Sequence, residues 1–124
     1  METQSKKILI LEDEKPLSRA LELKLTHEGF NVQTLPSGEG VMPLIEKENF
    51  SLIICDLVMP KVDGFQVLQK IKEEGLNIPV IILTNLSQSE DEKRVRSLGA
   101  KDFFVKSDTS LSKLVEYIKE IFNN

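Results

Sequence analysis

Short apolar runs and helical periods alternate along this chain at nearly even spacing. Runs typical of strands begin near Lys7, Phe30, Ser51, Pro79 and Lys101, which places them 21 to 28 residues apart. Between them, apolar residues recur at the spacing of a helix with one face on a core. This alternation predicts an α/β fold, in which a doubly wound five-stranded parallel sheet carries helices on both faces.

Glycines and capping signals indicate where the helices begin and end. Gly29, Gly75 and Gly99 each follow a helical period and precede a strand, where glycine adopts the left-handed conformation that ends a helix. Ser87 and Glu90 have the spacing of a capping box and predict the start of the fourth helix there.

The size and charge of the chain exclude several classes of protein. The 124 residues predict a single domain, 1–124, with a core of about 6–122. A net charge of -4 argues against direct nucleic-acid binding, which needs a basic patch. No stretch approaches the roughly 20 apolar residues of a membrane span. The single cysteine and the lack of an apolar leader in residues 1–6 predict a cytoplasmic protein.

Polar side chains follow four of the predicted strands at their carboxyl ends. Parallel strands end at the same edge of a sheet, so these groups are expected to share one site. With the strand order 2-1-3-4-5, ligands bind where the order reverses, between the first and third strands. The groups in question are the acids Glu12 and Asp13, the acid Asp56, the hydroxyl of Thr84 and the amine of Lys106.

Carboxylates that converge repel one another unless a cation relieves them. Oxygen ligands on a partly open site suit Mg²⁺. A carboxylate nucleophile beside such an ion, with an ammonium and a hydroxyl opposite, is the equipment for phosphoryl transfer. In this interpretation Asp56 is the nucleophile, Lys106 neutralises the phosphoryl charge, and Thr84 donates a hydrogen bond to a phosphoryl oxygen.

Each of these residues also has an ordinary structural explanation. An aspartate after a strand is more often a turn residue or a cap, by roughly four to one for a lone Asp. Glu12 and Asp13 would suit the start of a helix. Thr84 could begin a turn, and Lys106 could be a solvated surface residue. The shared sheet edge outweighs the four separate coincidences that this explanation requires.

Together these residues resemble the receiver domain of two-component response regulators over nearly the whole chain. That resemblance implies a flavodoxin-like (βα)5 fold and a phosphorelay function. The motifs that carry it are Glu12-Asp13, then Asp56 with Pro60 and Gly64 at the offsets of the family, then Thr84, and then Phe103 three residues before Lys106.

The resemblance also implies a role for each site residue. Asp56 is the expected phosphoacceptor, with a sensor histidine kinase or a phosphotransfer protein as donor. Mg²⁺, for which Mn²⁺ is expected to substitute, would be bound by the side chains of Asp13 and Asp56. Glu12 would act mostly through a water molecule, and the backbone carbonyl of Val58 would be a further ligand.

Phosphorylation is expected to act through Thr84 and Phe103. Thr84 would move toward the phosphoryl oxygens and Phe103 would turn inward behind it. The face made by the fourth helix, the fifth strand and the fifth helix would then change its preference for an output partner. Such a protein catalyses only its own phosphorylation and dephosphorylation, and it is not a turnover enzyme.

Three positions depart from the usual family pattern. Ser107 follows the lysine where proline is usual, and a cis bond is far more costly without proline. Asn85 is larger than the usual small residue after the switch threonine and is expected to alter transfer or hydrolysis rates. Glu12 replaces the commoner aspartate, which is a tolerated variation.

Four alternatives remain open at this point. The chain could be a receiver cut from a longer regulator with a DNA-binding or other output domain, or a pseudo-receiver that only binds partners. A phosphatase of the haloacid-dehalogenase type would need an acid two residues after Asp56, where Val58 stands. A flavin or nucleotide protein would need a glycine-rich loop after the first strand, where acids stand instead.

Overall fold

The computed structural model describes residues 6–123 and contains one parallel sheet. The strand order is β2-β1-β3-β4-β5, and every neighbouring pair is parallel. The predicted doubly wound, flavodoxin-like sheet is therefore confirmed. Its strands are β1 (Lys7–Leu11), β2 (Asn31–Leu35), β3 (Leu52–Cys55), β4 (Val80–Thr84) and β5 (Asp102–Val105).

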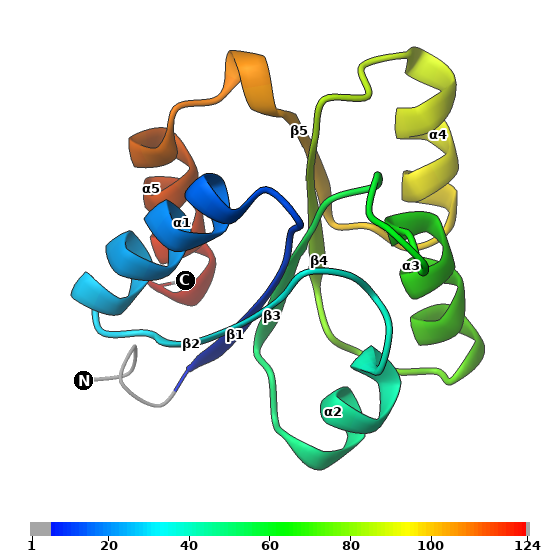
Figure 1. Ribbon diagram of the computed structural model, residues 1–124, viewed down its shortest axis with the longest axis horizontal. Helices are drawn as coiled ribbons and strands as arrows, with labels where there is room; N and C mark the ends of the chain where they lie inside the picture. The colour runs from blue at the N-terminus through cyan, green and yellow to red at the C-terminus, as the bar shows by residue number, and fades with distance from the viewer. Residues whose placement is uncertain (1–5, 124) are drawn as a thin grey trace.

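Between residues 6 and 123, four helices connect the strands, a fifth follows β5, and together they cover both faces of the sheet. α1 and α5 lie on one face, and α2, α3 and α4 lie on the other (Figure 1). A 3₁₀ turn, η2, follows β5 directly. The helices are α1 (Lys15–His27), α2 (Val41–Lys47), α3 (Gly64–Glu73), α4 (Ser89–Ser97) and α5 (Leu111–Asn123), and η2 covers Lys106–Asp108.

Alternate side chains of the central strands enter two separate hydrophobic cores. On β1, Ile8 and Ile10 pack with residues of α1 and α5, whereas Leu9 and Leu11 pack with residues of α2 and α3. All four are fully buried. Strands buried on both faces are apolar throughout, which is why these segments are recognisable in the sequence.

The sequence predicted the glycines that end three helices correctly, but it predicted the start of α4 wrongly. Gly29, Gly75 and Gly99 have φ values of 99°, 67° and 100°, as predicted for residues that end helices. The capping box predicted at Ser87 is wrong, because α4 begins at Ser89 and its N-cap makes no side-chain hydrogen bond.

A capping box instead begins α3. The amide of Gln66 donates to Asp63 Oδ1 at 2.9 Å, and the amide of Asp63 donates to Gln66 Oε1 at 2.9 Å. The Ser/Thr-x-x-Glu/Gln spacing identifies a possible box but does not select the residue at which a helix begins, because tertiary packing also acts on that boundary.

The structure tests the expected lack of a membrane span but not the expected lack of a leader. Between residues 6 and 123, no helix combines the length and the apolar character needed to cross a bilayer. The lack of an apolar leader concerns residues that lie almost wholly outside the described part of the chain.

Candidate functional site

The pairing of β1 with β3 places two acids side by side at the carboxyl edge of the sheet. Leu11 is the register partner of Cys55, and the amide of Asp56 donates to the Leu11 carbonyl at 3.0 Å. Glu12 and Asp56 are the next residues along the two strands, and each is only 4% exposed. The predicted convergence of these two carboxylates is therefore present, and it follows directly from the strand register.

Gly64 allows α3 to start close beneath the loop that carries Asp56. A Cβ atom at position 64 would collide with the Asp56 carbonyl oxygen and crowd the backbone of Leu57. The Gly64 amide also donates to the Leu57 carbonyl at 3.1 Å. Because only glycine fits this approach, the motif residue Gly64 acts on the site through the backbone.

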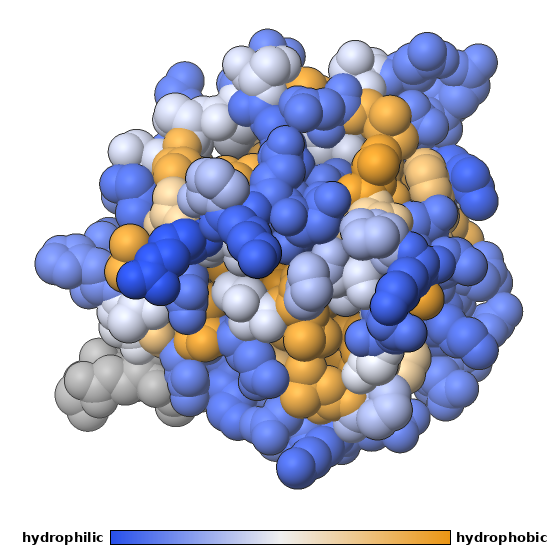
Figure 2. All heavy atoms as spheres, viewed as in Figure 1, coloured by the Kyte–Doolittle hydropathy of each residue, from blue (hydrophilic) through white to orange (hydrophobic). Residues whose placement is uncertain are grey.

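Asp13 completes an acidic cluster with Glu12 and Asp56. One carboxylate oxygen from each residue lies within 4.8 Å of those of the other two. Such a donor set contains only carboxylate oxygens, which fits a hard divalent cation. Figure 2 shows hydrophilic atoms gathered in the same region, between α1 and the α3–α4 pair.

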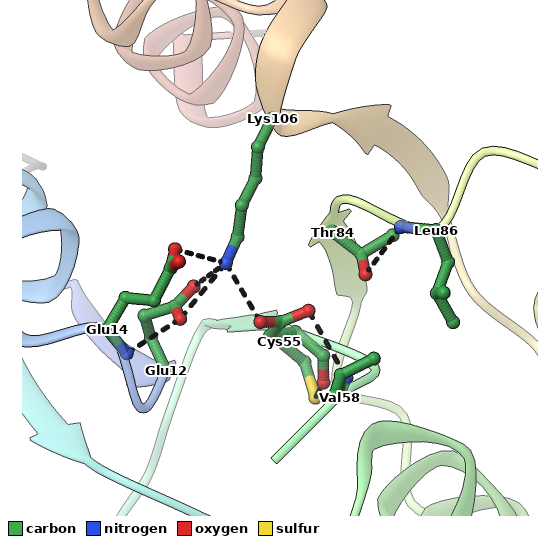
Figure 3. Close-up of polar contacts among 8 residues, drawn as sticks. Glu12, Glu14, Cys55, Val58, Thr84, Leu86 and Lys106 are labelled. Atoms are coloured by element: carbon green, nitrogen blue, oxygen red, sulfur yellow. Dashed lines mark hydrogen bonds and ion pairs between the residues drawn. The ribbon is translucent and has the colours of Figure 1, made fainter.

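Lys106 brings an ammonium from the last strand into this cluster. Its Nζ lies 2.9 Å from Asp56 Oδ2, 3.0 Å from Glu12 Oε1 and 2.8 Å from Glu14 Oε1. Figure 3 shows the side chain extending from the end of β5 toward Glu12 and Glu14. Burial alone would lower the pKa of Lys106, but hydrogen bonds to Glu14, Asp56 and Glu12 raise it, so the ammonium stays charged.

Glu12 lies in the least hydrated part of the cluster. Burial raises its pKa to about 7, and the charge of Asp56 acts in the same direction. The Glu14 amide, which donates to Glu12 Oε2 at 3.0 Å, and the Lys106 ammonium act in the opposite direction. Within the part of the chain that the structure describes, the acids outnumber the single ammonium that contacts them, which is the imbalance that a bound cation relieves.

Thr84 lies fully buried on the other side of a cavity of about 280 Å³. Asp13, Asp56, Thr84 and Lys106 all line this cavity. The Thr84 Oγ1 accepts a hydrogen bond from the Leu86 amide at 3.3 Å. The turn role considered for this residue is therefore present, and it places the hydroxyl at the site as well.

The two remaining predicted residues occupy different places. Phe103 is partly buried and packs against the core beneath α3 and α4. The Val58 amide donates to Asp56 Oδ1 at 3.3 Å, and the residue, which lines the cavity, is 57% exposed. A role of the Val58 carbonyl as metal ligand and an inward turn of Phe103 stay predictions.

Ser107 and Asn85 each directly follow a residue of the site, Lys106 and Thr84. Ser107 is exposed within η2, and no cis peptide bond occurs in residues 6–123. Lys106 reaches the acids without the usual proline. Asn85 lines the cavity and is exposed, so it lies at the mouth of the cavity.

Sequence reasoning missed the contact between Glu14 and Lys106. Glu14 follows Glu12 by two residues, between the end of β1 and the start of α1. The chain bends at residue 13, so no strand or helix periodicity in the sequence indicates where the Glu14 side chain points.

The model of the response regulator receiver domain family matches residues 8–119 of the chain. Among curated proteins, the probable transcriptional regulator ycf27 of Porphyra purpurea is 40% identical over 106 residues, or 86% of this chain and 43% of the relative. The response regulator ArlR of Staphylococcus aureus (strain Mu50) is 39% identical over 99 residues, or 80% of this chain and 45% of ArlR. The chain thus spans less than half the length of these relatives.

Solved structures show the same architecture. The receiver domain of the Francisella response regulator 1452 superposes with a TM-score of 0.87 at 25% identity, covering 96% of this chain and 98% of that one. A CheY-like receiver domain protein from Methanospirillum hungatei gives a TM-score of 0.87 at 25% identity, with 95% and 94% covered.

Proposed function

The chain belongs to the response regulator receiver family, and on that premise we propose that Asp56 accepts a phosphoryl group from a histidine kinase or a phosphotransfer protein. The observation that carries the proposal is a buried carboxylate that lies 2.9 Å from the Lys106 ammonium and faces a cavity lined by further polar groups. A buried aspartate with this partner has a nucleophilic oxygen and a cation ready for the incoming charge.

In the proposed transfer, one carboxylate oxygen of Asp56 attacks phosphorus in line with the bond that breaks. With phosphohistidine as donor, the phosphorus–nitrogen bond breaks and the imidazole nitrogen keeps the electron pair. An oxygen–phosphorus bond to Asp56 forms in the same step. Lys106 donates hydrogen bonds to the phosphoryl oxygens and offsets their negative charge.

Glu12, Asp13 and Asp56, with the Val58 carbonyl, are the residues that would hold Mg²⁺. When bound, the ion supplies further neutralisation of the phosphoryl charge. Mn²⁺ would substitute, because carboxylate, carbonyl and water ligands suit both ions. The oxygen-only cluster supports this assignment.

The phosphorylated form would be recognised through α4, β5 and α5. Thr84 would leave its contact with the Leu86 amide to bind a phosphoryl oxygen, and Phe103 would follow into the space behind it. Phosphate would then stabilise one of two arrangements of this face, which shifts their populations and changes the output partner that binds.

We place this switch in the cytoplasm and assign it no external substrate, which family membership supports. Curated relatives named as transcriptional regulators favour an output that controls transcription, in the same polypeptide or in a partner. The contact of Lys106 with Asp56 disfavours a pseudo-receiver that only binds partners.

Labelling with a small phosphodonor tests the proposal. The protein is incubated with acetyl phosphate and Mg²⁺, and its intact mass is measured. We expect one added phosphoryl group on the unmodified protein, and none after Asp56→Asn or with EDTA. Asp63→Asn is the matched control, because this half-buried aspartate caps α3 outside the acidic cluster.

Equal labelling of the Asp56→Asn variant would remove Asp56 from its assigned role. No labelling of the unmodified protein by acetyl phosphate or by any phosphorylated histidine kinase would favour the pseudo-receiver instead.

A further inference from the structure

Among the described residues, the Lys106 ammonium contacts three carboxylates. The contacts are to Glu12 at 3.0 Å, Glu14 at 2.8 Å and Asp56 at 2.9 Å. An ammonium group has three N–H donors and no acceptor. Its donors are therefore fully used, and a new acceptor at Lys106 must displace one of these carboxylates.

Exposure distinguishes the three carboxylates as candidates for release. The side chains of Glu12 and Asp56 are 3% and 5% exposed, whereas that of Glu14 is 54% exposed. A buried carboxylate that loses its partner has no water to replace it, and this is costly. Glu14 returns to solvent, so its contact with Lys106 is the least costly one to break.

Capping of α1 does not explain the direction of the Glu14 side chain. Glu14 is the N-cap residue of α1, yet its side chain makes no capping hydrogen bond. Glutamate is also not among the residues that favour this position. The carboxylate instead turns toward Lys106 and lines the same cavity as Asp56 and Thr84.

We propose that Glu14 is a positioning residue. Its carboxylate accepts a hydrogen bond from the Lys106 N–H group that must instead bind a phosphoryl oxygen on Asp56. Phosphorylation then exchanges Glu14 for phosphate at this ammonium. The contact stabilises the unphosphorylated form and weakens the binding of any phosphoryl group. This inference rests on the function proposed above for Asp56 and Lys106.

Beryllofluoride, which mimics a phosphoryl group on a carboxylate, is the probe for the test. Its affinity in the presence of Mg²⁺ is measured from amide shifts in NMR spectra of the full chain. We expect Glu14→Gln to bind it about two- to fivefold more tightly, as suits the loss of a half-exposed ion pair. Glu46→Gln on α2 removes an equal charge from an exposed position and is expected to change nothing.

Glu14→Asp separates the contact from the charge. The shorter side chain keeps the charge at the cavity mouth but no longer reaches the ammonium. We expect it to bind beryllofluoride more tightly than the unmodified protein, as Glu14→Gln does. An unchanged affinity for Glu14→Asp would overturn the inference, since the charge alone would then account for Glu14→Gln.

A spectroscopic signal gives an independent readout. The carboxyl carbon resonance of Glu14, assigned by its loss in Glu14→Gln, is expected to move on beryllofluoride addition toward that of an exposed glutamate. Thermal unfolding of each variant checks that it folds.

Two negative results have different meanings. Equal affinity for beryllofluoride in all variants, with binding intact, would overturn the role of Glu14 alone. No binding by the unmodified protein would remove the proposed function and the role of Glu14 with it.

Discussion

α4 and α5 flank the same edge strand, β5, but they are held to the sheet in different ways. α5 buries Leu114, Val115 and Ile118 in the core on its side. Within the described chain, α4 buries a single residue, Val95. The two helices therefore differ mainly in how much apolar surface attaches each of them to the sheet.

Besides Val95, α4 is held by the partly buried Leu98 at its C-cap and by exposed charged groups. Arg96 pairs with Asp102 of β5 at 3.0 Å and with Glu92 of the same helix at 3.1 Å. The Arg94 guanidinium lies 4.0 Å from the centre of the Phe65 ring. Contacts of this kind contribute little individually, so α4 can be displaced at low cost.

β5 connects the site to both helices. Phe103 packs into the core under α4, and the next residue, Phe104, lies against Tyr117 of α5 with ring centres 5.1 Å apart. Thr84 and Lys106, at the ends of β4 and β5, line the cavity. A structural change at the site should therefore displace α4, which is weakly attached to the sheet, more readily than α5, which is packed firmly against it.

Truncating one buried residue in each helix is expected to have the largest effect. Ile118→Ala should lower the free energy of unfolding by about 2–5 kcal/mol. Val95→Ala should lower it by about 1.5 kcal/mol, from about 0.8 kcal/mol for each buried carbon removed. Urea unfolding followed by circular dichroism measures both. A loss for Val95→Ala as large as that for Ile118→Ala would contradict the comparison.

Occupation of the site should alter the two helices unequally. On addition of Mg²⁺ and beryllofluoride, amide hydrogen exchange in α4 should change by about fivefold or more, the lower end of typical couplings between sites. Exchange in α5 should change much less. Asp56→Asn is the control and should show no response. Equal changes in both helices would remove α4 as the preferred moving element.

Loss of the contact between Arg94 and Phe65 should have a smaller effect. Arg94→Ala is expected to lower stability by about 0.5–1 kcal/mol, the usual range for an exposed cation–π pair. Lys93→Ala, at the preceding exposed position of α4, is the matched control and should change stability by less than about 0.5 kcal/mol. Equal losses from the two variants would show that the aromatic contact contributes nothing measurable.

An effect no larger than that of Arg94→Ala concerns Asp102, which joins α4 to β5. Burial alone would raise the pKa of its carboxyl, but the Phe103 amide, the Tyr117 hydroxyl and Arg96 lower it below the ordinary 3.8. The ionised group therefore stabilises the fold above pH 3.8, and this contribution is lost as the pH falls through the folded-state pKa.

Asp102→Asn should accordingly cost up to about 1 kcal/mol near neutral pH and less in acid. Urea unfolding at several pH values measures the difference. A cost that stays constant with pH would show that the carboxylate charge is not responsible.

Residues that end the buried strands were predictable from the sequence because local pattern determines them. Asp56 follows an apolar run that is buried on both faces, and the register of β1 and β3 then brings it beside Glu12. The contact between Glu14 and Lys106 was not predicted. It joins residues 92 positions apart, and it depends on the direction of a long side chain after β5.

The starts of the helices also show that a local sequence pattern predicts some features and not others. Ser87 and Glu90 have a capping spacing without forming a cap, whereas Asp63 and Gln66 form a box that was not predicted. A capping spacing is short and occurs by chance, and tertiary packing decides which instance begins a helix.

Locating the phosphoryl group tests the central claim most directly. After treatment with acetyl phosphate and Mg²⁺, borohydride reduction of the acyl phosphate and peptide mapping identify the modified carboxylate. We predict the reduced residue at Asp56 alone. Reduction at Glu12, Asp13 or a position outside the cavity, with Asp56 unchanged, would contradict the account.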